Sequence, residues 1–427
     1  MAKVEPFRAV IYNQEEVKNL SSVVCPPYDV ISPAQQQYYH DLDPHNFIKI
    51  LFGQDIRGEN KYARAAMLFK DWQKKNILVH DDGSAVYFYS QQYNLKGEKK
   101  TRLGFIARLY LENKKSTIYT HEHTRMAPKE DRLKLLREVK ANLSPIFIVF
   151  PDKKRVINHI FQKHIPGKKP FMDLVDTEKV AHKIWRLDSP DILDAIRLKM
   201  QNESIFIADG HHRYEVACAY KEEMNKKLGA SNPEAGYNYI MAYFTNTDSN
   251  GLTILPIHRL VKFAPKPDTD KFISGIKEYF DVEEVKDKTK FFFLMQKGAR
   301  GEHLLGMYSG KKYLLLRLKN IKILDKLIND KPLEFRSLDV SILNHIILKK
   351  ILGLDLENKD NITFSPDAED LIKKVDSDDS NIAFFLNPVK VQQIISVALT
   401  GENMPAKSTY FYPKVLSGLV INKHEGS

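Results

Sequence analysis

The chain has 427 residues, of which 43% are hydrophobic and 28% charged, and its formal net charge is +11. This length exceeds what one core usually organises, so we expect a folded protein of two or three domains. The longest apolar runs, such as 146–150 and 291–295, fall far short of the ~20 residues that a membrane-spanning helix needs, so we expect no membrane span.

Cysteine content and charge narrow the class further. Two cysteines, Cys25 and Cys218, exclude a disulfide framework and a four-cysteine zinc site. The N-terminus lacks the basic and apolar stretches of a secretory signal, so we expect a cytoplasmic protein. The positive charge favours anionic partners. These include nucleotides, phosphorylated metabolites and nucleic acid alike, but lysine and arginine are mixed with acids, as in 96–100, and form no basic arm, so nucleic acid ranks second.

Up to residue 262 the pattern alternates between strands and helices. Strands rich in β-branched and aromatic residues are expected at 85–89, 103–111, 146–150 and 204–208. Helices, in which apolar residues recur every three or four positions, are expected at 62–75, 128–139, 190–200 and 212–224. This alternation predicts a mixed sheet with helices packed against it.

Two prolines, Pro265 and Pro267, interrupt the pattern and divide the chain into expected domains 1–262 and 263–427. In the second domain, helices are expected at 268–280, 338–352, 367–375 and 388–399, and extended segments at 306–316 and 382–386. The expected fold class is therefore α/β (α+β), with a C-terminal α/β domain that contributes to the pocket.

The segment Asp209-Gly210-His211-His212-Arg213 lies between an apolar strand and a helix. The first N–H groups of a helix have no intrahelical partner and its dipole favours anions, so this turn suits phosphate. Gly210 permits close backbone approach, and Arg213 and His211 add donors. Because a carboxylate would repel phosphate, Asp209 is expected to accept a proton or to hold Mg²⁺. The alternative is that Asp209 only caps the helix and the histidines are exposed.

A second polar segment, 121–125, precedes a helix that begins near Pro128. In an extended stretch His121 and His123 point to one side and Glu122 to the other. The segment can supply a general base at Glu122, metal ligands at the two histidines, or only a solvated loop.

A metal-dependent hydrolase is the alternative enzyme, since histidines of both segments with Asp209 and Glu122 could supply three zinc ligands. Arg213 argues against it, because a guanidinium suits phosphate better than a metal shell.

Two later segments carry groups that suit anionic ligands. Arg259, after His258, can hold a carboxylate by paired hydrogen bonds, or the two can be a surface pair. In 404–414, the two lysines Lys407 and Lys414 and the hydroxyls of Ser408 and Thr409 could close over an anionic ligand. We expect this segment to reach across the domain boundary towards the Asp209 turn; the alternative is a buried edge segment that anchors the C-terminus.

The turn at 209–213 resembles the signature of ParB/sulfiredoxin-like folds, where an equivalent turn binds nucleotide phosphates, and it is similar to that of free serine kinases, which phosphorylate L-serine with a nucleotide donor. Nearly the whole chain resembles a large bacterial and archaeal family of unknown function. The segments that carry this second resemblance are 24–30, 44–47, 121–124, 209–215, 255–259 and 404–414.

The resemblance implies a ParB/sulfiredoxin-like core with insertions and a phosphotransferase that uses ADP or ATP with Mg²⁺. The acceptor would be free L-serine or another small hydroxylated metabolite, and the reverse reaction would dephosphorylate phosphoserine. Gly210, His211, Arg213 and Thr124 would bind phosphate, Asp209 and His212 would act in catalysis, and Asp209 would hold the metal. Glu122 matches the catalytic glutamate of the kinases, although its greater distance from the turn implies an insertion.

A binding module is the alternative to an enzyme: a ParB-like nucleotide switch or a nucleic-acid partner. A DNA-partition protein would normally add a helix-turn-helix, and the pattern after 268 does not contain a convincing one.

Overall fold

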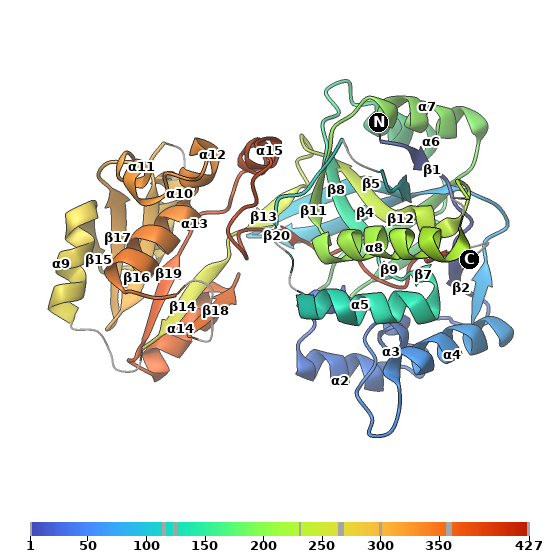
Figure 1. Cartoon of the computed structure of the whole chain (residues 1–427), viewed down its shortest axis with the longest axis horizontal. Helices are drawn as coiled ribbons and strands as arrows, with labels where there is room; N and C mark the ends of the chain where they lie inside the picture. The colour runs from blue at the N-terminus through green and yellow to red at the C-terminus, as the bar shows by residue number, and fades with distance from the viewer. Residues whose placement is uncertain are drawn as a thin grey trace. The chain divides into compact units, whose positions relative to one another are not determined.

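The computed structural model describes residues 2–112, 117–122, 124, 126–229, 232–263, 269–298, 301–355 and 361–424, and the chain divides into two units (Figure 1). Unit 1 consists of Met1–Thr120, Thr124–Thr253 and Pro413–Ser427, and unit 2 of His121–His123 and Ile254–Tyr412. The main division thus follows Thr253 rather than residue 262. The two prolines that suggested the later division lie outside the described residues.

Unit 1 is built on a mixed sheet. In the described part of the chain it has nine strands, of which β1 pairs with β5 outside the main order β6-β11-β8-β12-β5-β4-β10-β9. The pairs β6–β11 and β8–β12 are parallel and the others antiparallel. The strands are β1 (Val4–Glu5), β4 (Val86–Leu95), β5 (Glu98–Tyr110), β6 (Ile118–Tyr119), β8 (Ile146–Phe150), β9 (Met172–Val175), β10 (Ala181–Leu187), β11 (Ile205–Asp209) and β12 (Tyr239–Asn246).

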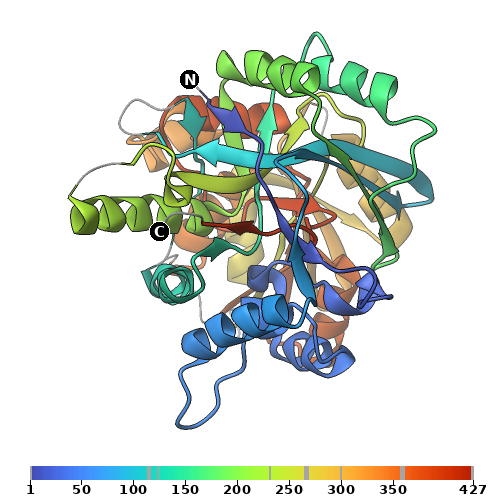
Figure 2. The same ribbon diagram turned by 90° about the vertical axis from the view of Figure 1, so that its right-hand side faces the viewer.

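Helices flank this sheet in layers (Figure 2). Helices α6 and α7 share a core with the sheet through Ile157 and Ile196, whereas α5 and α8 meet in a separate cluster around Leu136 and Val216. Helix α4 packs on α5 and forms a further layer. The helices are α1 (Leu20–Val23), α2 (Pro33–Leu42), α3 (Ile48–Leu51), α4 (Lys61–Lys74), α5 (Met126–Val139), α6 (Val156–His164), α7 (Pro190–Gln201) and α8 (His211–Leu228), with short 3₁₀ turns at Tyr28–Val30 and Gly236–Asn238.

Strand β8 shows why apolar and polar residues do not alternate along a central strand of this sheet. It reads Ile-Phe-Ile-Val-Phe, and each of its residues is buried. It lies between β11 and β12, and helices cover both faces of the sheet, so neither face of the strand meets solvent. The strands and helices that the sequence predicts up to residue 228 are confirmed, with ends shifted by up to six residues.

Unit 2 contains a second sheet, whose six described strands run antiparallel in the order β15-β17-β16-β19-β14-β18. Phe291 of α10, Leu371 of α14 and Phe385 of β19 belong to one core. The strands are β14 (His258–Lys262), β15 (Phe280–Val285), β16 (Leu304–Ser309), β17 (Lys312–Leu318), β18 (Ile362–Ser365) and β19 (Asn381–Phe385), and β13 (Thr253–Leu255) pairs separately with β20 (Tyr410–Tyr412).

The helices of unit 2 are α9 (Thr269–Tyr279), α10 (Lys288–Gly298), α11 (Ile323–Leu327), α12 (Leu333–Arg336), α13 (Asp339–Ile342), a π-helix (Leu343–Ile351), α14 (Ala368–Ser377) and α15 (Val391–Leu399). Two expectations were wrong in detail. The extended segment 306–316 is a hairpin, because Gly310 and Lys311 both adopt positive φ and reverse the chain. The helix expected at 338–352 begins as α13 and continues as the π-helix.

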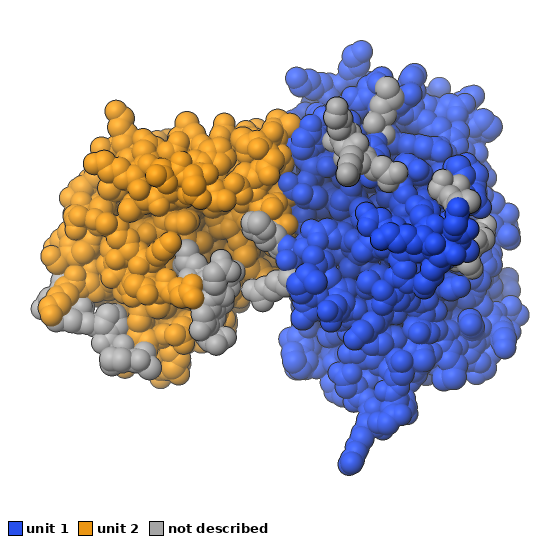
Figure 3. Space-filling view, in the orientation of Figure 1, with its two compact units in different colours: residues 1–120, 124–253, 413–427 blue, residues 121–123, 254–412 orange. Residues whose placement is uncertain are grey.

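The C-terminal segment Pro413–Ser427 belongs to unit 1 (Figure 3). Ser417 forms an isolated antiparallel β-bridge with Cys25, and Ile421 forms another with Val10. Strand β21 (Asn422–Lys423) then pairs with β7 (Ala141–Asn142), while β2 (Val10–Tyr12) pairs with β3 (Leu78–His80). The described part of this segment, 413–424, is thus held in the first unit.

The fold class is α+β, as the sequence predicted. Within the described residues, no helix combines the length and the apolar character needed to cross a bilayer.

The close approach of β5 and β12 gives a test of the sheet. A Cβ at Gly104 would lie 2.3 Å from the carbonyl oxygen of Phe244 and 2.6 Å from the ring of Tyr243. Overpacking a well-packed core costs about 1–3 kcal/mol. Gly104→Ala should therefore lower the free energy of unfolding, measured by urea denaturation, by about 3 kcal/mol, the upper end of that range. Gly301→Ala is the control, because a Cβ there meets no atom within 4 Å. Equal urea midpoints for the two variants would contradict this packing.

Candidate functional site

The turn from β11 into α8 has the predicted strand, glycine and helix. Gly210 adopts φ 89°, in the left-handed region, and its carbonyl accepts the first helical hydrogen bond from Tyr214 N at 3.0 Å. A Cβ at Gly210 would lie 2.9 Å from Arg213 Nη2 and 3.0 Å from Ile146 Cγ2. Both the backbone conformation and the space therefore require glycine here.

The structure rejects the reading of Asp209 as a simple helix cap. Gly210, not Asp209, occupies the N-cap position of α8, and a glycine has no side chain that could make a capping hydrogen bond. His211 is buried rather than exposed, and His212 is half-buried. The polar residues of the turn thus lie against the protein instead of projecting into solvent.

Two cations converge on Asp209. Lys414 Nζ lies 3.2 Å from Asp209 Oδ2, and Arg213 Nη2 lies 3.7 Å from the same oxygen. Arg213 also donates to the carbonyl of Pro145. Burial by itself would raise the pKa of Asp209, but Lys414 and Arg213 outweigh it and lower the pKa to about 2. We call Asp209, Arg213 and Lys414 the Asp209 cluster; it carries one positive charge in excess of its carboxylate.

Lys414 is the residue of the segment 404–414 that contacts the Asp209 turn within unit 1. The sequence predicts that Lys414, with Lys407, Ser408 and Thr409, closes over an anionic ligand, but it gives the approach to the turn to Lys407 or Ser408.

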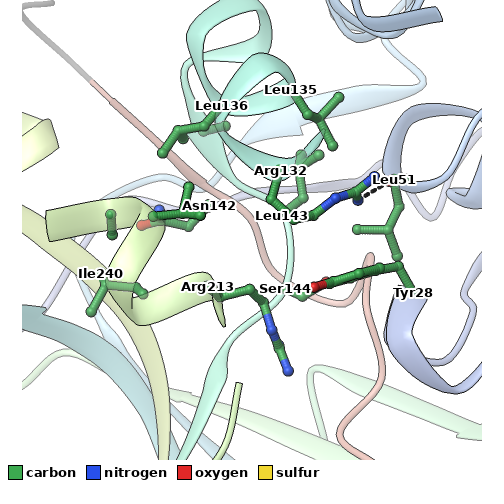
Figure 4. Close-up of a pocket in the computed structure, with 13 residues that line it drawn as sticks. Tyr28, Leu51, Arg132, Leu135, Leu136, Asn142, Leu143, Ser144, Arg213 and Ile240 are labelled. Atoms are coloured by element: carbon green, nitrogen blue, oxygen red, sulfur yellow. Dashed lines mark hydrogen bonds between the residues drawn. The ribbon is translucent and has the colours of Figure 1, made fainter. Parts of the chain in front are cut away.

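A cavity adjoins the turn, between the second half of α5 and the first two turns of α8 (Figure 4). It encloses about 490 Å³, its open mouth included. Its apolar lining comes from Leu51, Leu135, Leu136, Val216 and Ile240, and its polar lining includes Tyr28, Arg132, Ser144 and Arg213. In Figure 4 the guanidinium of Arg213 points away from Leu136 and Ile240, so this side chain separates the apolar part of the cavity from the Asp209 carboxylate.

Tyr28 and Arg132 form the polar wall opposite. The guanidinium of Arg132 lies 4.3 Å from the centre of the Tyr28 ring and donates to the Leu51 carbonyl at 2.7 Å. Burial raises the pKa of Tyr28 to about 12, although Arg213 and Arg132 oppose this shift. The short 3₁₀ turn that follows Pro27 places Tyr28 in the cavity. Cys25 is buried and burial raises the pKa of its thiol, which does not suit a nucleophile.

Arg132 could have been noticed in the sequence. It is buried on α5 together with Leu135, Leu136 and Val139, at the spacing of one helix face. A basic residue within an apolar stripe indicates a specific partner, because a buried guanidinium must be hydrogen-bonded or paired.

Thr124, which we expected to bind phosphate, makes a protein contact. Its Oγ1 donates to Glu215 Oε2 at 2.6 Å, and Lys129 Nζ lies 3.0 Å from the same oxygen. These contacts tie the start of α5 to the first turn of α8.

In unit 2, Glu122 forms a parallel bridge with Met404, whose N–H donates to the His121 carbonyl at 2.7 Å. His123 lies outside the described residues. Among those that are described, no group of three or more histidine, cysteine, aspartate or glutamate side chains is arranged to hold a metal ion.

His258 and Arg259 are buried, so the alternative of a surface pair is wrong. His258 Nδ1 accepts from Leu386 N at 3.2 Å, and Arg259 donates to the carbonyls of Ile257 and Lys407, the latter at 3.0 Å. Burial lowers the pKa of Arg259 to about 9.

The turn that Arg259 holds contains Lys407, which is exposed with φ 57°, and Ser408, whose hydroxyl donates to the Pro405 carbonyl. Thr409 is half-buried. The structure thus brings Arg259 and Lys407 together within unit 2. The expected approach of Lys407 to the Asp209 turn stays a prediction.

Comparison with known proteins gives the family. A family model described as "Protein of unknown function (DUF1015)" matches residues 4–341. No curated protein matches the sequence.

Several solved structures align with much of the chain. A free serine kinase variant in complex with ADP aligns at 13% identity and a TM-score of 0.35, over 72% of this chain and 87% of its own. A conserved hypothetical protein from Pyrococcus furiosus aligns at 14% identity and a TM-score of 0.33, over 73% of this chain and 92% of its own. SbnI with a C-terminal truncation, from Staphylococcus aureus, aligns at 11% identity and a TM-score of 0.34, over 74% of this chain and 86% of its own.

The charge pairing at Asp209 should appear in the pH dependence of stability. Because its folded-state pKa of about 2 lies below the ordinary value of 3.8, ionised Asp209 stabilises the fold above pH 4, and this contribution is lost as the pH falls towards 2. The stability difference between the wild type and Asp209→Asn should narrow by about 2 kcal/mol across that range. Urea denaturation at each pH measures it, with the exposed Asp248→Asn as control. A constant difference would contradict the pairing.

Proposed function

The chain belongs to the DUF1015 family, and we propose that it is a nucleotide-dependent phosphotransferase with a ParB/sulfiredoxin-like core, acting on a small hydroxylated metabolite, with free L-serine as the acceptor. The observation that carries this proposal is the Asp209 cluster at the N-terminus of α8. It supplies an excess cation, a glycine without room for a side chain and the positive end of a helix dipole at one place. These are the requirements of a phosphate site.

The nucleotide phosphates would bind at the first turn of α8. Arg213 would contribute charge-assisted hydrogen bonds, His211 a ring donor, and Gly210 the close approach of the backbone. Thr124 would act indirectly, since its hydroxyl holds Glu215 on the same helix. The apolar cavity beside Arg213 suits the uncharged part of a ligand, with Tyr28 and Arg132 at its polar wall.

The residues at Asp209 do not fit a protein-bound magnesium ion. Lys414 and Arg213 lie within 4 Å of Oδ2 and would repel a dication there. The proposal therefore assigns the neutralisation of phosphate charge to these two side chains, and Asp209 positions them.

In the reaction, the serine hydroxyl would attack the terminal phosphorus of ADP or ATP, and the bond to the bridging oxygen would break to release AMP or ADP. The hydroxyl proton would go to Glu122, which the resemblance to free serine kinases supports, with His212 as the other candidate for proton transfer. The turn at 407–409 would serve the acceptor carboxylate, and Arg259 would act through this turn, whose Lys407 carbonyl it holds. Phosphoserine dephosphorylation would use the same groups in reverse.

The proposal is tested by incubating the protein with L-serine and ADP or ATP, with and without Mg²⁺, and detecting phosphoserine by ³¹P NMR. A parallel melting-temperature series adds CTP and phosphoserine, because a ligand that binds only the folded state raises the melting temperature. Phosphoserine formation supports the proposal. Nucleotide binding without phosphoryl transfer to any hydroxyl compound would favour a nucleotide switch, and no nucleotide binding would overturn it.

Arg213→Ala should weaken ADP binding by about 10- to 100-fold, since a hydrogen bond to a charged group contributes about 1.5–3 kcal/mol. Isothermal titration calorimetry measures the affinity. Arg197→Ala is the matched control, because Arg197 pairs with Glu5 on the exposed side of α7. Wild-type affinity in a folded Arg213→Ala protein would remove Arg213 from the phosphate site.

Glu122→Gln should leave ADP affinity within about twofold of wild type and lower turnover by roughly 100-fold or more, the usual scale of general-base catalysis. Initial rates of phosphoserine formation measure the effect, with the exposed Glu130→Gln as control. Unchanged turnover would leave Glu122 with the structural role that its bridge to Met404 provides.

A further inference from the structure

A pair of fully buried polar side chains lies in the middle of the main sheet of unit 1. Arg102 of β5 stands opposite Gln91 of β4 in the strand register, and both side chains are inaccessible to solvent. Arg102 Nε donates to Gln91 Oε1 at 3.0 Å. Burying a guanidinium is costly, so such a pair is expected to have a specific task.

This pair holds the backbone on both sides of Lys414. Arg102 Nη2 donates to the carbonyl of Pro413, and Gln91 Nε2 donates to the carbonyl of Lys414 at 2.9 Å. The two carbonyls flank the Cα of Lys414. Fixing both therefore fixes the direction in which the lysine side chain leaves the segment.

The same pair is linked to the strand that carries Asp209. The guanidinium of Arg102 lies 4.7 Å from the centre of the Phe147 ring and 5.6 Å from that of Tyr243. Phe147 is the β8 residue that pairs with Asp209 in the register. The planar guanidinium can lie against aromatic faces and donate from its edge at once, which a lysine ammonium cannot do.

We infer that Arg102 and Gln91 are positioning residues for the phosphate site: they hold the C-terminal segment so that Lys414 stays on Asp209 and its charge is available to the ligand. The inference rests on the proposed function, because Lys414 matters to a reaction only if the Asp209 cluster binds phosphate. It makes the C-terminal segment a part of the site rather than an anchor alone.

Gln91→Glu separates positioning from stability. A glutamate at 91 keeps the size of the side chain and can pair with Arg102, but it loses the N–H that Gln91 donates to the Lys414 carbonyl. The protein should therefore fold while Lys414 is no longer held. Gln91→Met removes the same donor without adding a charge and serves if the glutamate variant fails to fold. Gln92→Glu, on the opposite face of β4, is the matched control.

The experiment measures ADP affinity of the full chain by calorimetry for the wild type, Gln91→Glu, Lys414→Met and the double variant. We expect about a tenfold loss for each single variant and no further loss in the double variant, because both changes act through Lys414. Additive losses of ADP affinity in the double variant would overturn the inference. So would wild-type ADP affinity in Gln91→Glu when Lys414→Met binds ADP weakly. Either outcome leaves the proposed function standing.

A second readout does not depend on nucleotide binding. The rate of reductive methylation of Lys414, measured by mass spectrometry, should rise several-fold in Gln91→Glu relative to Lys423 in the same segment. An unchanged rate would overturn the inference. A wild type that binds no nucleotide, with a Lys414 that becomes reactive in Gln91→Glu, would overturn the proposed function but not the positioning of Lys414 on Asp209.

Discussion

The site depends on one constraint: a half-buried carboxylate has to be balanced, and here two cations from different parts of the chain balance it. Asp209 ends β11, Arg213 lies one turn into α8, and Lys414 comes from the C-terminal segment. Removing one partner of a buried ion pair leaves an uncompensated charge, which costs several kcal/mol. The cluster is therefore stable only when the strand, the helix and the segment are all in place. Because its charges do not cancel, it still attracts an anion once it has formed.

The same constraint explains why the end of the chain is so firmly bound in unit 1. Lys414 lies 205 positions from Asp209, and closing so long a loop costs conformational entropy that one ion pair cannot supply. The segment is accordingly held along its length. Ser417 bonds to the backbone of Cys25 and its hydroxyl lies 2.5 Å from that of Ser144, while Asn422 donates to Asn142 at 2.8 Å. Many small contacts together therefore offset the entropy of loop closure, and the segment does not depend on Lys414 as its anchor.

The sequence predicted those features that depend on neighbours along the chain. The apolar run of β8, the periodicity of α5 and α8, and the turn around Gly210 are local patterns, and each forms where it was expected. Features set by distant partners were missed. Lys414 has no local mark that distinguishes it from Lys407, because its role comes from the path of the segment across β4 and β5. The hairpin at Gly310 was read as one strand because the residues on both sides are equally apolar.

The pairing at Asp209 also limits which residue can remove a proton. A carboxylate is an effective general base when its pKa lies near the working pH, and the two cations that lower the pKa of Asp209 to about 2 make it a weak base. Burial alone would have had the opposite effect, so the cations determine the outcome. Asp209 is thus suited to hold Arg213 and Lys414 for the phosphates, and an acceptor hydroxyl needs its base elsewhere. A phosphate site built from side-chain cations rather than a metal ion also does little to lower the pKa of that hydroxyl. The demand for a separate base, for which Glu122 is the proposed residue, therefore follows from the same electrostatics on which the proposed phosphate site rests.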